Sequence, residues 1–108
     1  MSDQRTRAVF LVLTNPKPPM TDAEFNRWYD TVHVPDVLKT PGFVAATRYQ
    51  HADPKPGDAR YLAVYELDTD DVAAAGKALG QVLKEARAQG RMADIQVVSA
   101  AYYKRLDT

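Results

Sequence analysis

Residues 20–49, MTDAEFNRWYDTVHVPDVLKTPGFVAATRY, place a cluster of aromatic and acidic residues directly before a proline. Pro35 has no amide hydrogen to donate, and its ring disfavours helical geometry at the preceding residue, Val34. We therefore expect the helix in this stretch to end or kink near His33. The side chains best suited to catalysis or binding thus lie beside a predicted helix break.

The start of the same helix is specified by a capping box. Thr21 and Glu24 have the Ser/Thr-x-x-Glu spacing in which each side chain accepts a hydrogen bond from the other residue's backbone N–H. Met20 and Phe25 occupy the positions of a hydrophobic staple. One buried stripe at helical spacing then consists of Phe25, Trp28, Tyr29 and Val32. The pattern predicts a helix over residues 21–32.

Length and composition narrow the class of protein. The 108 residues have the length of one domain, and we expect a single domain over residues 1–108. Lys plus Arg balance Asp plus Glu at 14 each, which argues against nucleic acid or an anionic membrane surface as a partner. The lack of cysteine excludes disulfides, thiolate metal sites and thiol catalysis. With no apolar run typical of a signal peptide or of a membrane span, we expect a cytoplasmic protein.

Apolar periodicity and turn residues predict the remaining elements. We expect strands over residues 8–13, 43–51, 60–67 and 95–106, and helices over residues 21–32 and about 71–90. The segment 34–40 is expected to add a further turn. The order β-α-β-β-α-β is typical of the α+β ferredoxin-like fold, in which two helices cover one face of a four-stranded antiparallel sheet. Strand 8–13 is apolar on both faces, so we expect a second copy to cover the other face as a homodimer.

The block EFNRWYDTVHVPDVLKTPGFVAATRY, residues 24–49, resembles the EthD-like branch of the dimeric α/β-barrel superfamily. The shared features are a helix with an aromatic or acidic cluster, then His-x-Pro, then Pro-Gly-Phe, and a strand ending in Arg-Tyr. The resemblance implies two ferredoxin-like subunits whose sheets meet face to face as a barrel, with a pocket between each sheet and its own helices. It also singles out His33. Such domains include polyketide cyclases and dehydratases, lactone isomerases, cofactor-free oxygenases and haem-linked enzymes, so the reaction must be argued from the site.

His33 is one of two histidines and the main candidate for catalysis. Imidazole titrates near neutral pH, so it can take or give a proton without a large change of environment. Asp30 and Asp36 lie three residues to either side and could orient the ring. We name Asp36 as a substrate-site residue. The alternative is a structural histidine that caps the helix end or bonds Asp36.

Aromatic residues supply the other candidates. We name Tyr65 as a catalytic residue, because a phenol can donate a hydrogen bond to a developing oxyanion. Tyr61 lies on the same strand face, and the helix residues Trp28 and Tyr29 would line the pocket; all of these aromatic side chains could equally fill the core. His51 could reach the pocket rim from the end of its strand, or it could be a surface residue.

Strict alternation along residues 43–51 separates the side chains of that strand into two faces. Phe43 and Tyr49 then share one face, and Arg48 lies on the other. We therefore expect Arg48 to stay out of the pocket and to form an ion pair with Glu66 at the dimer interface.

We expect neither a metal nor a cofactor. A triad of His33, His51 and an aspartate is conceivable, but the spacing of the two histidines has no pattern typical of metal ligands. Haem binding through His33 rests on the resemblance alone. The segment NPKPP after the first strand is no phosphate-binding loop, which argues against nucleotides.

The leading hypothesis is a homodimeric, cofactor-independent enzyme: a lyase, isomerase or cyclase that uses general acid/base chemistry on a small aromatic or cyclic molecule. A first alternative is a cofactor-free oxygenase of a phenolic substrate. A second is a non-catalytic module for ligand binding or assembly.

Overall fold

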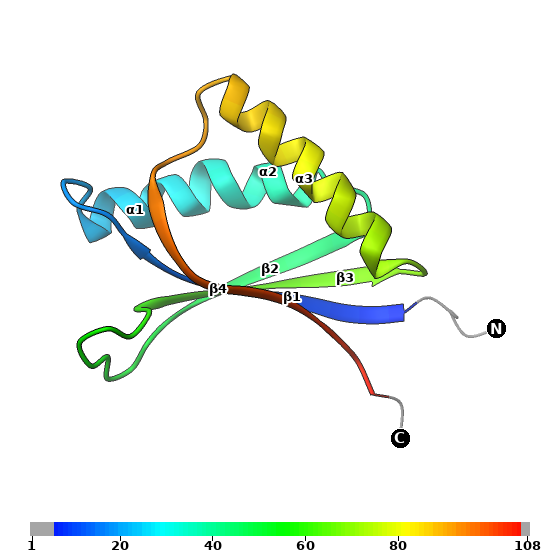
Figure 1. The fold of residues 1–108 in the computed structure, drawn as a ribbon, viewed down its shortest axis with the longest axis horizontal. Helices are drawn as coiled ribbons and strands as arrows, with labels where there is room; N and C mark the ends of the chain where they lie inside the picture. Colours follow the sequence, from blue (N-terminus) through cyan, green and yellow to red (C-terminus); the bar gives the residue numbers. More distant parts are fainter. Residues whose placement is uncertain (1–5, 107–108) are drawn as a thin grey trace.

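The computed structural model describes residues 6–106, which form one twisted sheet with all of its helices on one side (Figure 1). The strands are antiparallel, lie in the order β2-β3-β1-β4, and comprise β1 (Thr6–Pro16), β2 (Phe43–Gln50), β3 (Tyr61–Thr69) and β4 (Ile95–Lys104). The helical segments are α1 (Asp22–Trp28), η1 (Tyr29–His33), α2 (Val34–Leu38) and α3 (Val72–Ala88). This is the predicted ferredoxin-like α+β fold.

Side-chain caps begin both helical regions. The Thr21 hydroxyl accepts a hydrogen bond from the backbone N–H of Glu24 at 3.1 Å, and the Glu24 carboxylate accepts one from the N–H of Thr21 at 2.9 Å. Asp71 caps α3 by accepting from the N–H of Ala74 at 3.0 Å. These contacts confirm the predicted capping box and the predicted start of the second helix, because they satisfy donors that a helix start leaves free.

Of the two alternatives predicted near His33, an end or a kink, the helix end is not observed. The chain instead passes through one wide π-helical turn, η1, and continues helically to Leu38. In this turn the N–H of Val34 donates to the carbonyl of Tyr29, five residues earlier. Pro35 cannot donate, and in a regular α-helix its ring would clash with the carbonyl four residues before it. The wide turn therefore accommodates the proline without ending the helix.

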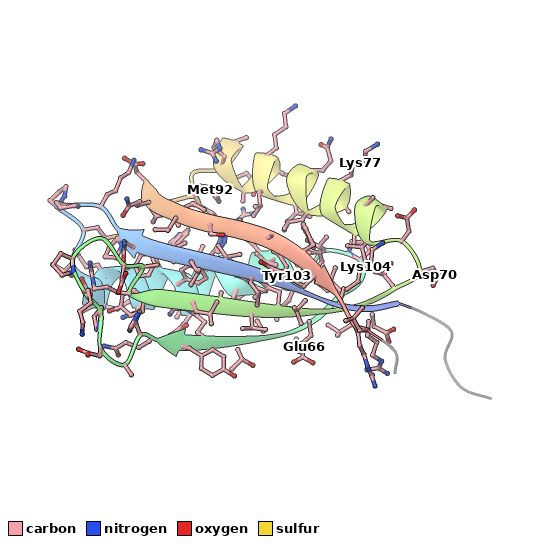
Figure 2. The ribbon with its side chains drawn as sticks, turned by 60° about the horizontal axis from the view of Figure 1, so that its bottom comes forward. Glu66, Asp70, Lys77, Met92, Tyr103 and Lys104 are labelled. Atoms are coloured by element: carbon pink, nitrogen blue, oxygen red, sulfur yellow. The ribbon has the colours of Figure 1, made fainter. Side chains whose placement is uncertain are left out.

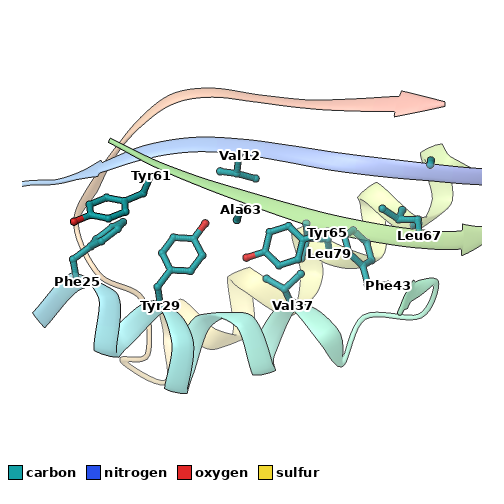
Figure 3. Close-up of a cluster of buried hydrophobic side chains, with 12 residues drawn as sticks. Val12, Phe25, Tyr29, Val37, Phe43, Tyr61, Ala63, Tyr65, Leu67 and Leu79 are labelled. Carbon is teal, nitrogen blue, oxygen red and sulfur yellow. The ribbon is translucent and has the colours of Figure 1, made fainter. Parts of the chain in front are cut away.

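The wide turn also keeps one face of the helix buried. Phe25, Tyr29, His33 and Val37 are all buried and recur every four residues. In a straight α-helix a step of four residues drifts by about 40°, so these four would spread over about 120°. Each residue in the wide turn η1 rotates by less than in an α-helix, which offsets part of this drift, and Phe25, Tyr29 and Val37 all point toward the sheet (Figure 3).

A β-bulge near the start of β2 overturns the predicted alternation of that strand. Phe43 pairs with Leu67 and Ala45 with Glu66, so that Val44 is an extra residue without a cross-strand partner. Phe43 is buried and Val44 is 60% exposed. Beyond a bulge, the side chains of a strand exchange faces relative to a regular strand. Arg48, which is opposite the buried Ala63, therefore faces the helices and not the outer surface.

The outer face of the sheet is apolar, as the alternation in β1 predicted. Cross-strand pairs on this face include Leu11 with Val64 and Leu13 with Leu62. Figure 2 turns this face toward the viewer, with the exposed Tyr103 labelled on β4. Among residues 6–106, none of the helices has the length and hydropathy needed to cross a membrane.

Candidate active site

A cavity of about 600 Å³ lies between the inner face of the sheet and the helices. The strands β1, β3 and β4 form its floor, η1, α2 and α3 form its walls, and the segment before β4 closes one end. Most of the lining side chains are aliphatic or aromatic. The polar or charged exceptions are Tyr29, His33, Tyr65, Arg87 and Asp94. The cavity thus suits a small, largely apolar molecule with a few polar groups.

His33 lies in the wall of this cavity and is 8% exposed. Its ring stacks on Trp28 with centroids 4.8 Å apart, and the Tyr29 ring meets it nearly at right angles at 4.9 Å. The Nδ1 atom is buried and has no hydrogen-bond partner among the described residues. Burial lowers the pKa of His33 to about 4, against the opposing charge of Asp36 and with the help of Arg48. The imidazole is therefore neutral at pH 7 and able to accept a proton.

Tyr29 and Tyr65 face the same cavity from opposite sides. Both side chains are 1% exposed, and Figure 3 shows the Tyr65 ring directed toward Tyr29. The two hydroxyls influence each other's ionisation, but no well-formed hydrogen bond joins them or satisfies either one in the described part of the chain. Burial raises the pKa of both phenols, so both remain protonated hydrogen-bond donors. Three buried polar atoms, the hydroxyls of Tyr29 and Tyr65 and the Nδ1 of His33, are thus left without well-formed hydrogen bonds on residues that line one cavity.

Trp28 and Tyr61, which were predicted to bind substrate, do not line the cavity. The Trp28 indole N–H donates to the carbonyl of Arg91 at 2.8 Å, and its ring forms the platform on which His33 stacks. The Tyr61 hydroxyl donates to the carboxylate of Asp22 at 2.7 Å. Both side chains have their polar groups satisfied by the protein and support the site from outside.

Asp36 is also buried outside the cavity. Its carboxylate accepts hydrogen bonds from Arg91 Nε at 2.9 Å and from Lys39 Nζ at 3.3 Å. Burial opposes the charge on this group, but the two cationic partners outweigh that effect and hold the pKa of Asp36 below its usual range. The residue is a fixed negative charge that ties α2 to the segment after α3, close enough to influence His33.

His51 lies apart from the cavity in the connection between β2 and β3. Its Nδ1 accepts a hydrogen bond from the N–H of Asp53 at 3.0 Å, and its Nε2 is 3.5 Å from the carboxylate of Asp58. The side chain is substantially exposed. This position matches the surface alternative considered for His51 and not the pocket rim.

Arg48 lies on the inner face of the sheet, whereas the alternation of its strand predicted the outer face. Its guanidinium donates to Asp30 at 2.9 Å and to Asn26 at 2.8 Å, and it covers the Tyr29 ring at 4.3 Å from the centroid. The predicted ion pair with Glu66 on the outer face is therefore wrong. The error follows from the bulge at Val44, for which the sequence VAAT carries no glycine or other turn residue as a signal.

Metal binding finds no support in the described geometry. Across residues 6–106, no three side chains of His, Cys, Asp or Glu gather as ligands of one ion would. His33 lies in the helical wall of the cavity and His51 in an exposed connection, so the two histidines do not form one donor set.

A comparison with known protein families tests the EthD-like resemblance that the His-x-Pro and Pro-Gly-Phe motifs suggested. The EthD domain matches residues 17–97. The chain belongs to the EthD family. This match covers α1 through α3 and the start of β4, and so includes every polar residue of the cavity.

Solved structures extend the similarity of this EthD-family chain over nearly its whole length, whereas no curated protein matches it. A proposed monooxygenase from Shewanella loihica PV-4 has a TM-score of 0.65 at 17% identity, covering 97% of this chain and 99% of that one. A dimeric ferredoxin-like protein of unknown function from Thermobifida fusca has a TM-score of 0.59 at 10% identity, covering 97% and 94%. SnoaB, a cofactor-independent oxygenase from Streptomyces nogalater, has a TM-score of 0.55 at 20% identity, covering 99% and 97%. At these identities the similarity establishes the fold alone.

Proposed function

We propose that this EthD-family chain is an enzyme that removes a proton from a small aromatic or cyclic substrate, with His33 as the general base and without a cofactor. The observation that carries the proposal is the buried, unpartnered Nδ1 of His33 in the wall of an apolar cavity. A buried polar atom without a partner costs about 1–3 kcal/mol, so its retention calls for an explanation. A substrate hydroxyl or an acidic C–H group would supply the missing partner.

The two tyrosines complete the proposed binding mode. When the substrate loses its proton, negative charge develops on its oxygen, and a protonated phenol can donate to that oxygen in a site shielded from water. Tyr65 and Tyr29 are both buried, protonated and unpartnered at the cavity. We therefore assign Tyr65, supported by Tyr29, to stabilising a phenolate or enolate.

Oxidation by molecular oxygen is the first candidate for the step after proton removal. The deprotonated substrate is electron-rich, and two of the similar structures carry the names of oxygenases, one of them cofactor-independent. Lyase, isomerase or cyclase chemistry is the second candidate. It is supported by the depressed pKa of His33, because an imidazolium with a pKa of about 4 readily returns its proton to another position of the substrate.

The experiment that tests the proposal measures oxygen uptake and substrate loss together. Hydroxyaromatic and cyclic keto compounds that bind in the cavity, detected by NMR shifts at His33 or Tyr65, are incubated with wild-type protein and with His33→Asn, which keeps a polar group but no base. Oxygen uptake that matches substrate loss favours the oxygenase, and product formation without oxygen uptake favours the lyase or isomerase. Turnover that survives in His33→Asn contradicts the proposal, and binding without turnover would favour the ligand-binding module.

We further propose that the chain forms a homodimer through the outer face of its sheet. That face carries the apolar pairs Leu11 with Val64 and Leu13 with Leu62, and Tyr103 is exposed beside them. A contiguous apolar face of this kind is typical of an interaction site. Sedimentation should give a dimer for the wild-type chain and a monomer for Val64→Glu. A wild-type chain that is monomeric at every concentration would refute the dimer.

A further inference from the structure

Arg48 lies behind the cavity, on the side of Tyr29 where no substrate is expected. The bulge at Val44 turns its side chain inward, and only 14% of that side chain is exposed. The guanidinium reaches the helix and contacts the same turn that carries Tyr29, through Asn26 and Asp30. A buried cation in this position is costly unless its partners compensate for the lost water.

The contacts of Arg48 hold it in one orientation. Its two terminal nitrogens donate to Asp30 and Asn26 at 2.9 and 2.8 Å, and its carbon Cζ lies 4.3 Å from the centre of the Tyr29 ring. A guanidinium over an aromatic face at this distance is an attractive cation–π contact. The Nε atom is buried without a hydrogen-bond partner among the described residues. The guanidinium thus keeps its contact with the Tyr29 ring although its Nε has no hydrogen-bond partner among those residues.

We propose that Arg48 is a positioning residue of the active site, which fixes the Tyr29 ring against His33 and supplies a permanent positive charge behind the cavity. This inference rests on the proposed function, because it assigns Arg48 a part in proton removal by His33. Arg48 acts through Tyr29, whose ring meets His33 at 4.9 Å, and does not line the cavity itself.

The charge of Arg48 acts on the base and on the two phenols. It lowers the pKa of His33, which keeps the imidazole neutral but weakens it as a base, and it partly offsets the burial that raises the pKa of Tyr29 and Tyr65. A positive charge at this place also favours the anion that forms in the cavity. The other charged or titratable groups around His33 and its cavity are Asp36 from α2, Tyr65 from β3, Arg87 from α3 and Asp94 before β4.

The test compares Arg48→Met, which removes the charge, with Arg48→Lys, which keeps the charge but lacks the planar fork. We expect Arg48→Met to lower kcat by on the order of 100-fold with little change in KM, since misplacing a catalytic group has effects of this size. The pKa of His33, followed by NMR, should rise from about 4 in Arg48→Met and stay low in Arg48→Lys. Arg48→Lys should lose about 10-fold in kcat through the weaker hold on Tyr29.

Arg60→Met is the matched control, because Arg60 also pairs with a carboxylate of the first helix, Asp22, but away from the cavity. It should leave kcat and the pKa of His33 unchanged. If Arg48→Met leaves the pKa of His33 unchanged, or lowers activity no more than Arg60→Met, the inference is overturned. If the pKa moves as expected but His33→Asn keeps full activity, the proposed function fails and the catalytic part of the inference fails with it, while the effect of Arg48 on the pKa of His33 stands. Should Arg48→Met not fold, the double variant Asn26→Ala/Asp30→Ala removes both hydrogen-bond partners of the guanidinium without removing its charge, and an unchanged kcat in that variant overturns the inference.

Discussion

Tyr61 and Tyr65 lie on the same face of β3 and are both buried, yet the two tyrosines differ in one respect. The Tyr61 hydroxyl has a partner in Asp22 at 2.7 Å, whereas the Tyr65 hydroxyl is near that of Tyr29 but makes no well-formed hydrogen bond in the described part of the chain. A satisfied buried hydroxyl contributes to stability, and an unsatisfied one costs free energy. Tyr61 therefore contributes to the stability of the fold, whereas Tyr65 and His33 are the residues that we propose to contact a ligand.

Among the variants, replacing the proposed base His33 should have the largest effect on turnover. We expect His33→Asn to lower turnover about 100-fold or more, the contribution typical of general acid/base catalysis. His51→Asn, which changes the other histidine in its exposed connection, should leave turnover unchanged. Steady-state kinetics of both variants, with circular dichroism to verify folding, provides the measurement. Equal losses in the two variants would remove the distinction between the two histidines.

The burial of His33 predicts a pH dependence of stability. The pKa is 6.5 in the unfolded chain and about 4 in the folded one, so between these values the unfolded state binds more protons. His33 therefore costs no stability above pH 6.5, and stability falls as the pH drops from 6.5 to 4, by on the order of 3 kcal/mol in total. Urea unfolding of wild type and His33→Gln from pH 4 to 7 isolates this effect as their difference. A difference that does not change with pH would contradict the burial of a neutral imidazole.

The variant Tyr65→Phe should separate activity from stability. Loss of one donor to the developing oxyanion should reduce kcat about 10-fold, with Tyr29 as the remaining donor. The free energy of unfolding should change by less than about 0.5 kcal/mol, because no hydrogen bond within the protein is lost. Chemical denaturation and kinetics on the same preparation test both parts. A large loss of stability would show that Tyr65 has a structural role instead.

Replacing Tyr61 should have the opposite result, a loss of stability without a loss of activity, and this effect should be the smallest. Tyr61→Phe breaks the hydrogen bond to Asp22 and should lower the free energy of unfolding by about 1 kcal/mol while kcat stays at the wild-type value. The measurement is the same pair of assays as for Tyr65→Phe. A reduced kcat with unchanged stability would place Tyr61 among the residues that act on the substrate.

The fold could be predicted from the sequence because its signals are local. The capping box of Thr21 and Glu24, the apolar runs and the Pro-Gly-Phe turn each specify one element, and their order specifies the ferredoxin-like arrangement. The two departures from the predictions arose where packing overrode a local rule. Pro35 predicts a helix end or a kink, but burial of residues on both sides of it keeps the chain helical through one wide turn. The bulge at Val44 depends on the pairing of β2 with β3, which the sequence of β2 alone does not specify.

The candidate site could be predicted only as a set of side chains facing one region. Periodicity placed Tyr29, His33 and Tyr65 on inward faces, and all three line the cavity. The same reasoning included Trp28 and Tyr61, which the structure turns into supports, because periodicity indicates a face and not the hydrogen-bond partner found there. Whether a buried polar group is satisfied depends on residues distant in the chain, such as Arg91 and Asp22.

The wide turn η1 has a consequence for comparing this protein with its relatives. A π-helical turn holds one residue more than the α-helical turn it replaces, so it corresponds to a single-residue insertion within a helix. A relative with a regular helix must therefore be aligned with a one-residue gap between Trp28 and Val34. If that gap is placed elsewhere, His33 is matched to a neighbouring position, and a histidine that corresponds to the proposed base is missed in the relative.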